Sequence, residues 1–195
     1  MSKSRFKDVY LLHGQGGFPD GTVAKLADTL RRGYPDVLFH LPLLPHSDPN
    51  VTAQFSLGYM ANQFLPFIRP DSLVVGISLG GLIAAKLQEL HPGLFDVFSI
   101  AAPTSIDTVR LEKKMDRRVA LYSSEDAATQ GRVGHWPSLT DIALDVKWLR
   151  HDVDLARYTV AYLLTCYMRG LDMITETENL FPKMLDTGTE LYEFK

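Results

Sequence analysis

Stretches with the hydrophobic pattern of buried strands alternate along the chain with stretches patterned as amphipathic helices. The strand-like stretches are short apolar runs bounded by glycine, proline and polar residues. The helix-like stretches repeat apolar residues every three or four positions. Such alternation is typical of a parallel sheet with helices packed on it. We therefore expect an α/β fold with a mostly parallel central sheet of about six strands and helices on both faces.

The same pattern gives approximate bounds for each element. The expected strands cover Phe6–Leu12, Val37–Leu41, Ser72–Ile77, Phe95–Ala101, Arg118–Ser123 and Ile142–Leu149. The expected helices begin at about Thr22, cover Thr52–Ile68, begin directly after Ser78, and cover Asp152–Met168. They end at helix-stopping signals, which are Gly33, Arg69-Pro70, His91-Pro92-Gly93 and Gly170 in turn.

Gly76-Ile77-Ser78-Leu79-Gly80 places a serine between the third expected strand and the helix that follows it. A strand that turns directly into a helix holds one residue in a strained, exposed conformation, and the flanking glycines leave room for that turn. The hydroxyl then stands at the carboxyl edge of the sheet, where ligands bind in such folds. Ser78 is therefore our candidate nucleophile, and the alternative is a serine that only caps the helix.

His13-Gly14-Gln15-Gly16-Gly17 follows the first expected strand and is too rich in glycine for regular structure. Acyl transfer needs preorganised donors for the oxyanion that develops on the substrate carbonyl. The backbone N–H of Leu79, directly after the serine, is one candidate donor, and that of Gln15 is the second. His13 is expected to orient this loop through its side chain rather than to act as the base.

A serine nucleophile needs a histidine base, and the base needs an orienting carboxylate. Of the histidines after the serine, His151 lies just past the last expected strand and is preferred over His135. Asp126 follows the fifth expected strand, at the same edge of the sheet, and is preferred over Glu125. No metal and no cofactor is expected.

Taken together, the HGQGG loop, GISLGG, SSED and RHDVD make the chain resemble the α/β-hydrolase superfamily, over nearly all residues up to about Gly170. The resemblance implies Ser78 as nucleophile, Asp126 as acid, His151 as base, and Gln15 and Leu79 as oxyanion-hole donors. The chain opens at the strand that bears the HG loop, and only about fifteen residues, Pro103 to Arg117, stand where larger members insert a cap. It therefore resembles the minimal, lidless members, which include small esterases, lipases and thioesterases.

The expected reaction is cleavage of a small carboxylic ester or thioester through an acyl-enzyme intermediate. Candidate substrate-binding residues lie in the loops of the same edge: Phe18, Leu43, His46, Phe55, Thr104 and Trp136. Two alternatives stay open. An acyltransferase or cyclase would use the same acyl-enzyme, and a binding protein could keep the fold without the activity.

The composition of the chain limits the classes of binding partner and the compartment that we expect. The 195 residues suit one domain over residues 1–195, and the net charge of −3 provides no basic field for nucleic acid or an anionic membrane. No apolar run is long enough to span a membrane, and the single cysteine, Cys166, requires no oxidising compartment, so we expect a cytoplasmic protein. Residues 171–195 form a C-terminal extension whose apolar residues are expected to pack on the domain or on a second copy of the chain.

Overall fold

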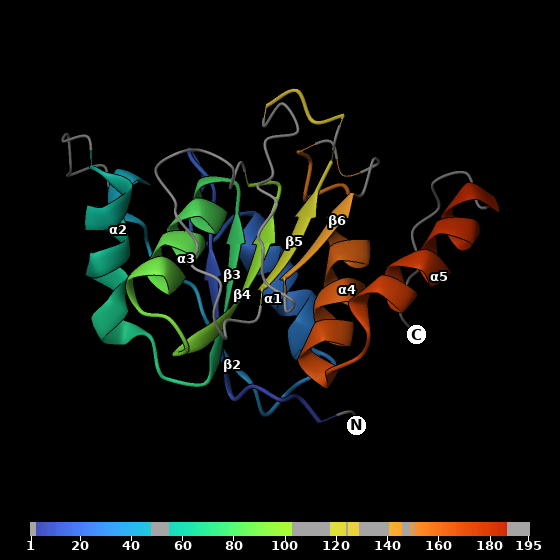
Figure 1. The fold of residues 1–195 in the computed structure, drawn as a ribbon, viewed down its shortest axis with the longest axis horizontal. Helices are drawn as coiled ribbons and strands as arrows, with labels where there is room; N and C mark the ends of the chain where they lie inside the picture. Colours follow the sequence, from blue (N-terminus) through green and yellow to red (C-terminus); the bar gives the residue numbers. More distant parts are fainter. Residues whose placement is uncertain are drawn as a thin grey trace.

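Six parallel strands form the central sheet of this protein, seen in a computed structural model (Figure 1). The structure describes residues 3–47, 55–102, 118–123, 125–128, 141–145, 149 and 151–186, and of residues 141–145 and 181–186 it describes the backbone alone. The strands are β1 (Asp8–Leu12), β2 (Leu38–His40), β3 (Ser72–Ile77), β4 (Phe95–Ile100), β5 (Arg118–Tyr122) and β6 (Asp141–Asp145). Their order is β2-β1-β3-β4-β5-β6, and every neighbouring pair is parallel.

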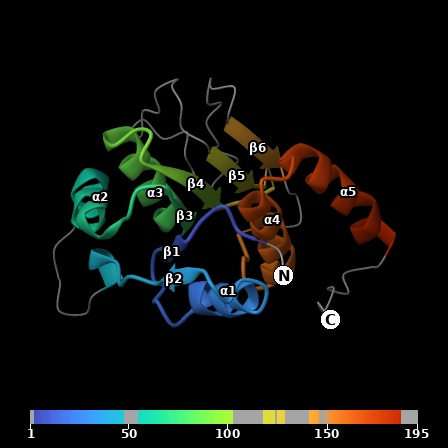
Figure 2. The ribbon, with the colours of Figure 1, turned by 90° about the horizontal axis from the view of Figure 1, so that it is seen from below.

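Helices cover both faces of this sheet (Figure 2). In the described part of the chain they are α1 (Thr22–Arg31), α2 (Leu57–Phe64), α3 (Leu79–Leu90), α4 (Arg157–Arg169) and α5 (Met173–Asp186), and short 3-10 helices include η1 (Pro45–Ser47) and η2 (Leu65–Phe67). The expected α/β architecture, with a parallel sheet of about six strands covered on both faces, is therefore confirmed. None of the helices in the described part of the chain combines the length and apolar content that a membrane span needs.

Alternate residues of β1 show how the sheet divides the core. Val9 and Leu11 pack with α1 and α4, whereas Tyr10 and Leu12 pack with α2 and α3. Successive side chains of a strand point to opposite faces, so a run of apolar residues is buried on both sides only when each face carries helices. All five residues of β1 and all six of β3 are buried. These two strands are therefore fixed from both faces.

The order of the strands places a crevice between β1 and β3. From β1 the chain moves outward to β2 and then returns to the other side of β1 as β3. Leu12 pairs with Gly76, so the loop after β1 and the turn after β3 leave the sheet side by side. Ligands of open α/β sheets bind at such a reversal, outside the carboxyl ends of the strands.

Helix α5 lies at the margin of the sheet and extends away from it (Figure 1). Met173 and Thr177, near its start, are buried, and Leu180 packs against the core on the α1 and α4 face. Of the two packing partners that the sequence left open, this first part of the tail contacts its own domain. Packing against a second copy, and a single domain over residues 1–195, stay predictions.

Candidate active site

Ser78 occupies the sharp turn that joins β3 to α3. Its φ of 52° and ψ of −115° lie outside the regions that residues with a side chain usually adopt. Its backbone N–H bonds to the carbonyl of Ile100 on the next strand, and its own carbonyl accepts the N–H of Gly81 in the helix. Among the described residues, the Ser78 side chain makes no capping hydrogen bond to α3. The hydroxyl is therefore not used to cap the helix, and it is available in the crevice above the sheet.

Three glycines allow this turn to pack so closely. A Cβ on Gly76 would lie 2.2 Å from the carbonyl oxygen of Gly80, and a Cβ on Gly80 would lie 2.3 Å from that of Leu12. A Cβ on Gly81 would lie 2.6 Å from the side chain of Ala102. All three distances are shorter than real Cβ contacts. Because these residues have no side chain, strand β3, helix α3 and the end of β1 can approach one another closely. Ser78 is held at their junction.

His151 and Asp126 form a hydrogen-bonded pair at the same edge of the sheet. The Nδ1 atom of His151 lies 2.9 Å from Oδ2 of Asp126, whose other oxygen accepts the N–H of Ala128 at 2.8 Å. The Asp126 side chain is 1% exposed and that of His151 is 33% exposed. Because the carboxylate can only accept, Nδ1 carries the hydrogen and Nε2 is left as the basic nitrogen.

Asp126, rather than Glu125, is the carboxylate that meets the imidazole. Glu125 is exposed to solvent, whereas Asp126 turns inward from the loop after β5. His151 itself has a positive φ of 67°, in the turn that precedes α4. The alternative base, His135, lies outside the described residues.

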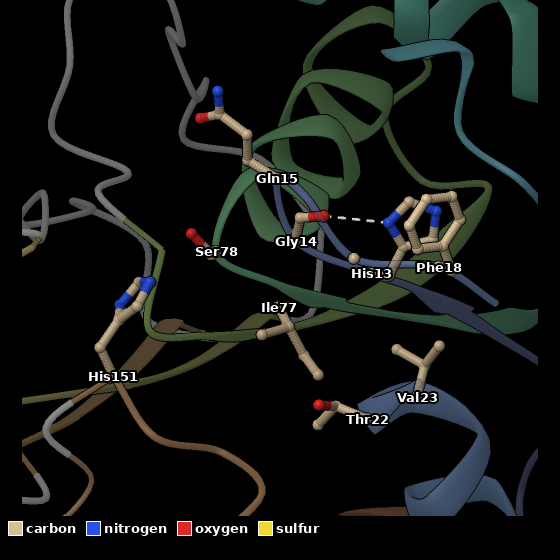
Figure 3. Close-up of a pocket in the computed structure, with 10 residues that line it drawn as sticks. His13, Gly14, Gln15, Phe18, Thr22, Val23, Ile77, Ser78 and His151 are labelled. Atoms are coloured by element: carbon tan, nitrogen blue, oxygen red, sulfur yellow. Dashed lines mark hydrogen bonds between the residues drawn. The ribbon is translucent and has the colours of Figure 1, made fainter. Parts of the chain in front are cut away.

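A pocket of about 180 Å³ joins these groups (Figure 3). Its walls come from the loop after β1, the first turn of α1, the end of β3 and the histidine of the turn before α4, and its lining residues are His13, Gly14, Gln15, Gly17, Phe18, Thr22, Val23, Ile77, Ser78 and His151. The structure thus brings the proposed nucleophile and base into one cavity, with Asp126 buried behind the base. No group of three or more potential metal-ligating side chains occurs within the described residues.

Several solved structures with a similar fold bear names that describe them as hydrolases or hydrolase homologues. A predicted CIB-like hydrolase from Thermoplasma acidophilum superposes with a TM-score of 0.66 at 12% identity, over 88% of this chain and 90% of that one. An α/β serine hydrolase homologue from Coxiella burnetii gives 0.62 at 12% identity, over 88% of each chain. An α/β-hydrolase enzyme from a sediment metagenome of the Mar Chica lagoon, Morocco, gives 0.60 at 15% identity, over 87% and 94%.

This chain has an α/β-hydrolase fold. At the level of sequence, no family model and no curated protein matches it. The similarity is thus one of fold, and the chemistry of this α/β-hydrolase fold has to be argued from its own residues.

The two residues whose backbone N–H groups were expected to bind an oxyanion, Gln15 and Leu79, both lie near Ser78. Gln15 lines the pocket, and its side chain points away from Ser78 (Figure 3), so its backbone would be the contributing group. Leu79 is the first residue of α3 and directly follows Ser78. The first N–H groups of a helix have no partner within it, and they attract negative charge. Both positions suit the donors expected from the sequence.

The candidate substrate-binding residues lie in three different places. Phe18 lines the pocket and is 49% exposed. Leu43 is exposed on the loop after β2, His46 packs beside His13, and Phe55 stacks on Tyr59, and none of these three lines the described pocket. Thr104 and Trp136 lie outside the described residues.

Sequence reasoning missed the wall that α1 contributes. Thr22, Val23 and Ile77 line the pocket, on the face of the sheet that packs against α1. A signal was present, because only residues 18–21 separate the glycine-rich loop from the helix expected to begin at Thr22. Its first turn therefore has to lie at the same edge of the sheet as the loop.

His13 is buried and bonds on both of its ring nitrogens. Nδ1 lies 3.0 Å from the carbonyl oxygen of Gly14, and the N–H of Leu44 donates to Nε2 at 3.2 Å. Burial lowers the pKa of this imidazole, although the bond to Gly14 raises it in part. His46 packs beside it, with ring centroids 5.5 Å apart, and burial lowers its pKa as well. Since both His13 nitrogens are engaged, His13 is not placed to act as a base.

Proposed function

We propose that this protein is a serine hydrolase that cleaves a carboxylic ester or thioester. The observation that carries the proposal is the His151–Asp126 hydrogen bond of 2.9 Å beside a strained Ser78 that shares a pocket with His151. A nucleophile, a base and a buried carboxylate that orients the base are the three parts that acyl transfer by serine requires.

In the proposed reaction, the Ser78 hydroxyl attacks the substrate carbonyl while Nε2 of His151 takes its proton. Asp126 holds the imidazole through Nδ1 and stabilises the positive charge that forms on it. The backbone N–H groups of Gln15 and Leu79 stabilise the oxyanion. The bond to the alcohol or thiol then breaks, and the leaving group departs with the proton from His151. This leaves the acyl group on Ser78.

Water completes the cycle. His151 removes a proton from a water molecule, whose oxygen attacks the acyl carbonyl, and the carboxylic acid is released as the proton returns to Ser78. The pocket walls that receive the substrate carry no Asp, Glu, Lys or Arg among the described residues. An uncharged acyl group is therefore the part of the substrate that this pocket favours.

The test is hydrolysis of p-nitrophenyl acetate and butyrate, and of an acyl thioester, by the wild type and three variants. Ser78→Ala is expected to abolish turnover. Asp126→Asn keeps the oxygen that accepts from Ala128 but loses the charge that orients His151, and should lower kcat about 10⁴-fold. The control is Asp71→Asn, an exposed position at the opposite edge of the sheet, which should keep wild-type kcat.

Product analysis with and without an added alcohol separates hydrolysis from acyl transfer. A hydrolase yields the free acid in both cases, whereas an acyltransferase yields mainly the new ester when the alcohol is present. A wild type that turns over none of these substrates would favour the binding protein that keeps only the fold.

A further inference from the structure

The tautomer of His13 follows from its two partners. The Gly14 carbonyl can only accept a hydrogen bond, so the Nδ1 atom that lies 3.0 Å from it carries the hydrogen. The Leu44 N–H can only donate, so Nε2 carries a lone pair. One neutral tautomer satisfies both bonds, and a protonated imidazole would lose the second. Leu44 is fully buried in the core on the α2 and α3 face, which anchors the imidazole at that end.

The bond to Gly14 also fixes the peptide that carries the Gln15 N–H. The carbonyl of Gly14 and the N–H of Gln15 belong to one planar trans unit, in which they point in opposite directions. Figure 3 shows the Gly14 oxygen directed at His13, with Ser78 and His151 on the other side of Gly14. The Gln15 N–H is therefore directed away from His13, toward the side where Ser78 stands.

Close packing places this peptide beside the nucleophile. A Cβ on Gly14 would lie 3.2 Å from Cβ of Ser78 and 3.3 Å from the carbonyl oxygen of Ile77. The Gly14 oxygen also accepts the N–H of Gly17 at 3.1 Å, across a turn in which Gly16 has a φ of 71°. Two donors from different directions hold one carbonyl, so the peptide plane is not free to rotate.

We propose that His13 is a positioning residue, which holds the Gly14–Gln15 peptide so that the Gln15 N–H faces the oxyanion formed at Ser78. The role rests on the proposed hydrolase function. It also links the loop after β2 to the oxyanion site, because the Leu44 N–H fixes the tautomer that donates to Gly14. His13 touches neither Ser78 nor His151 in any described hydrogen bond, so it would act through the backbone alone.

Two substitutions test the two hydrogen bonds of His13 one at a time, because each can keep one bond and lose the other. The amide of His13→Asn can place a donor where Nδ1 stands, which keeps the bond to the Gly14 carbonyl. The amide of His13→Gln reaches the position of Nε2 and can accept from Leu44, but it has no donor at the Nδ1 position. Misplacing an oxyanion-hole donor should lower kcat about 10²-fold. The control is His40→Gln, on β2, whose imidazole pairs with Asp8 away from the pocket.

The proposal predicts that His13→Gln loses kcat with little change in KM, whereas His13→Asn retains kcat within a few fold of the wild type. Affinity for a boronate that forms a tetrahedral adduct at the serine should fall in parallel with kcat. Thermal unfolding of the variants, measured alongside, shows whether each is folded. Equal kcat for the two variants, either retained or lost, would overturn the proposal.

The tautomer provides a second readout that does not depend on activity or on a variant. Nitrogen-15 NMR of the wild type should show the hydrogen of His13 on Nδ1, and a hydrogen on Nε2 would refute the positioning role. Failure of the hydrolase function would show in the wild type as absence of turnover, and would remove this proposal with it. Failure of the positioning role alone would show as an active wild type with the wrong tautomer or with equivalent variants.

Discussion

Ser78 adopts a backbone conformation that costs a residue with a side chain about 1–3 kcal/mol. Such strain persists only where the surrounding structure imposes it. Here the turn is held by hydrogen bonds to Ile100 and Gly81 and by glycines that admit no Cβ. The sheet and α3 therefore impose this conformation on Ser78, and they hold its hydroxyl above the edge of the sheet.

Replacing one of these glycines should be costly. In Gly80→Ala the new Cβ would lie 2.3 Å and 2.7 Å from the carbonyl oxygens of Leu12 and His13, so backbone has to move. We expect the free energy of unfolding, from urea denaturation, to fall by about 3 kcal/mol. The matched control is Gly33→Ala, where the nearest atom is 3.7 Å away and the free energy should change by less than about 1 kcal/mol. Equal effects of the two substitutions would contradict the packing argument.

Stability should also depend on pH through His13 and His46, whose rings pack beside each other. Burial lowers the pKa of His13 and His46 below the ordinary value of 6.5. As the pH falls from 6.5 toward the lowered values, the unfolded chain binds protons that the folded chain does not. The free energy of unfolding should therefore decrease over that window, with no contribution from these groups above it.

Urea unfolding of the wild type and of His46→Gln between pH 7.5 and 5 measures this contribution. The variant lacks one of the two groups, so its stability should fall less steeply below pH 6.5. An identical slope in the two proteins would show that His46 does not carry the effect.

At the scale of elements, β3, Ser78 and α3 could be predicted from sequence to within a residue. An apolar run, a serine between glycines and an amphipathic stretch all agree there. The predicted helix over Thr52–Ile68 was too long, because the α-helix ends at Phe64 and Pro66 lies in a 3-10 turn. Proline has no N–H to continue an α-helical ladder. The last predicted helix began too early, since residues before Arg157 form turns around Asp152 and its partner Leu155.

Helix α5 was not predicted from sequence, although Met173, Thr177 and Leu180 have helical spacing. It packs on α4, the helix that precedes it in the chain, and on β6, and these contacts cannot be read from the spacing of its own residues. The hydroxyl of Tyr162 donates to Glu176 at 2.6 Å, and the thiol of Cys166 lies 3.8 Å from the same oxygen. Burial raises the pKa of Cys166 to about 11, in agreement with a core thiol rather than a nucleophile.

Removing the carboxylate should loosen this helix. Glu176→Ala removes the hydrogen bond from the Tyr162 hydroxyl to Glu176, and a hydrogen bond to a charged group contributes about 1.5–3 kcal/mol. Hydrogen exchange of the α5 amides should accelerate by the corresponding factor, while amides of β1 and β3 stay protected. Glu178→Ala, an exposed neighbour on the same helix, is the control. Unchanged exchange in Glu176→Ala would show that α5 is held by its apolar contacts alone.

Across the whole molecule, the strand order explains why residues far apart in sequence meet at one edge. Ser78, Asp126 and His151 follow strands or precede helices at the carboxyl end of a parallel sheet, and that edge could be predicted from the alternation of elements. The face of the sheet that carries the pocket could not be predicted, because it depends on how α1 packs. Leu43, His46 and Phe55 were therefore named from the loops, whereas Thr22, Val23 and Ile77 line the described cavity.

The most direct measurement for the account as a whole is covalent labelling by a fluorophosphonate, which reacts with a serine activated by its base. Mass spectrometry of the labelled, digested wild type should place a single adduct on Ser78. Ser78→Ala should take up no label, and His151→Ala should label far more slowly while remaining folded. No adduct on the folded wild type, or an adduct on another residue, would contradict the proposed role of Ser78.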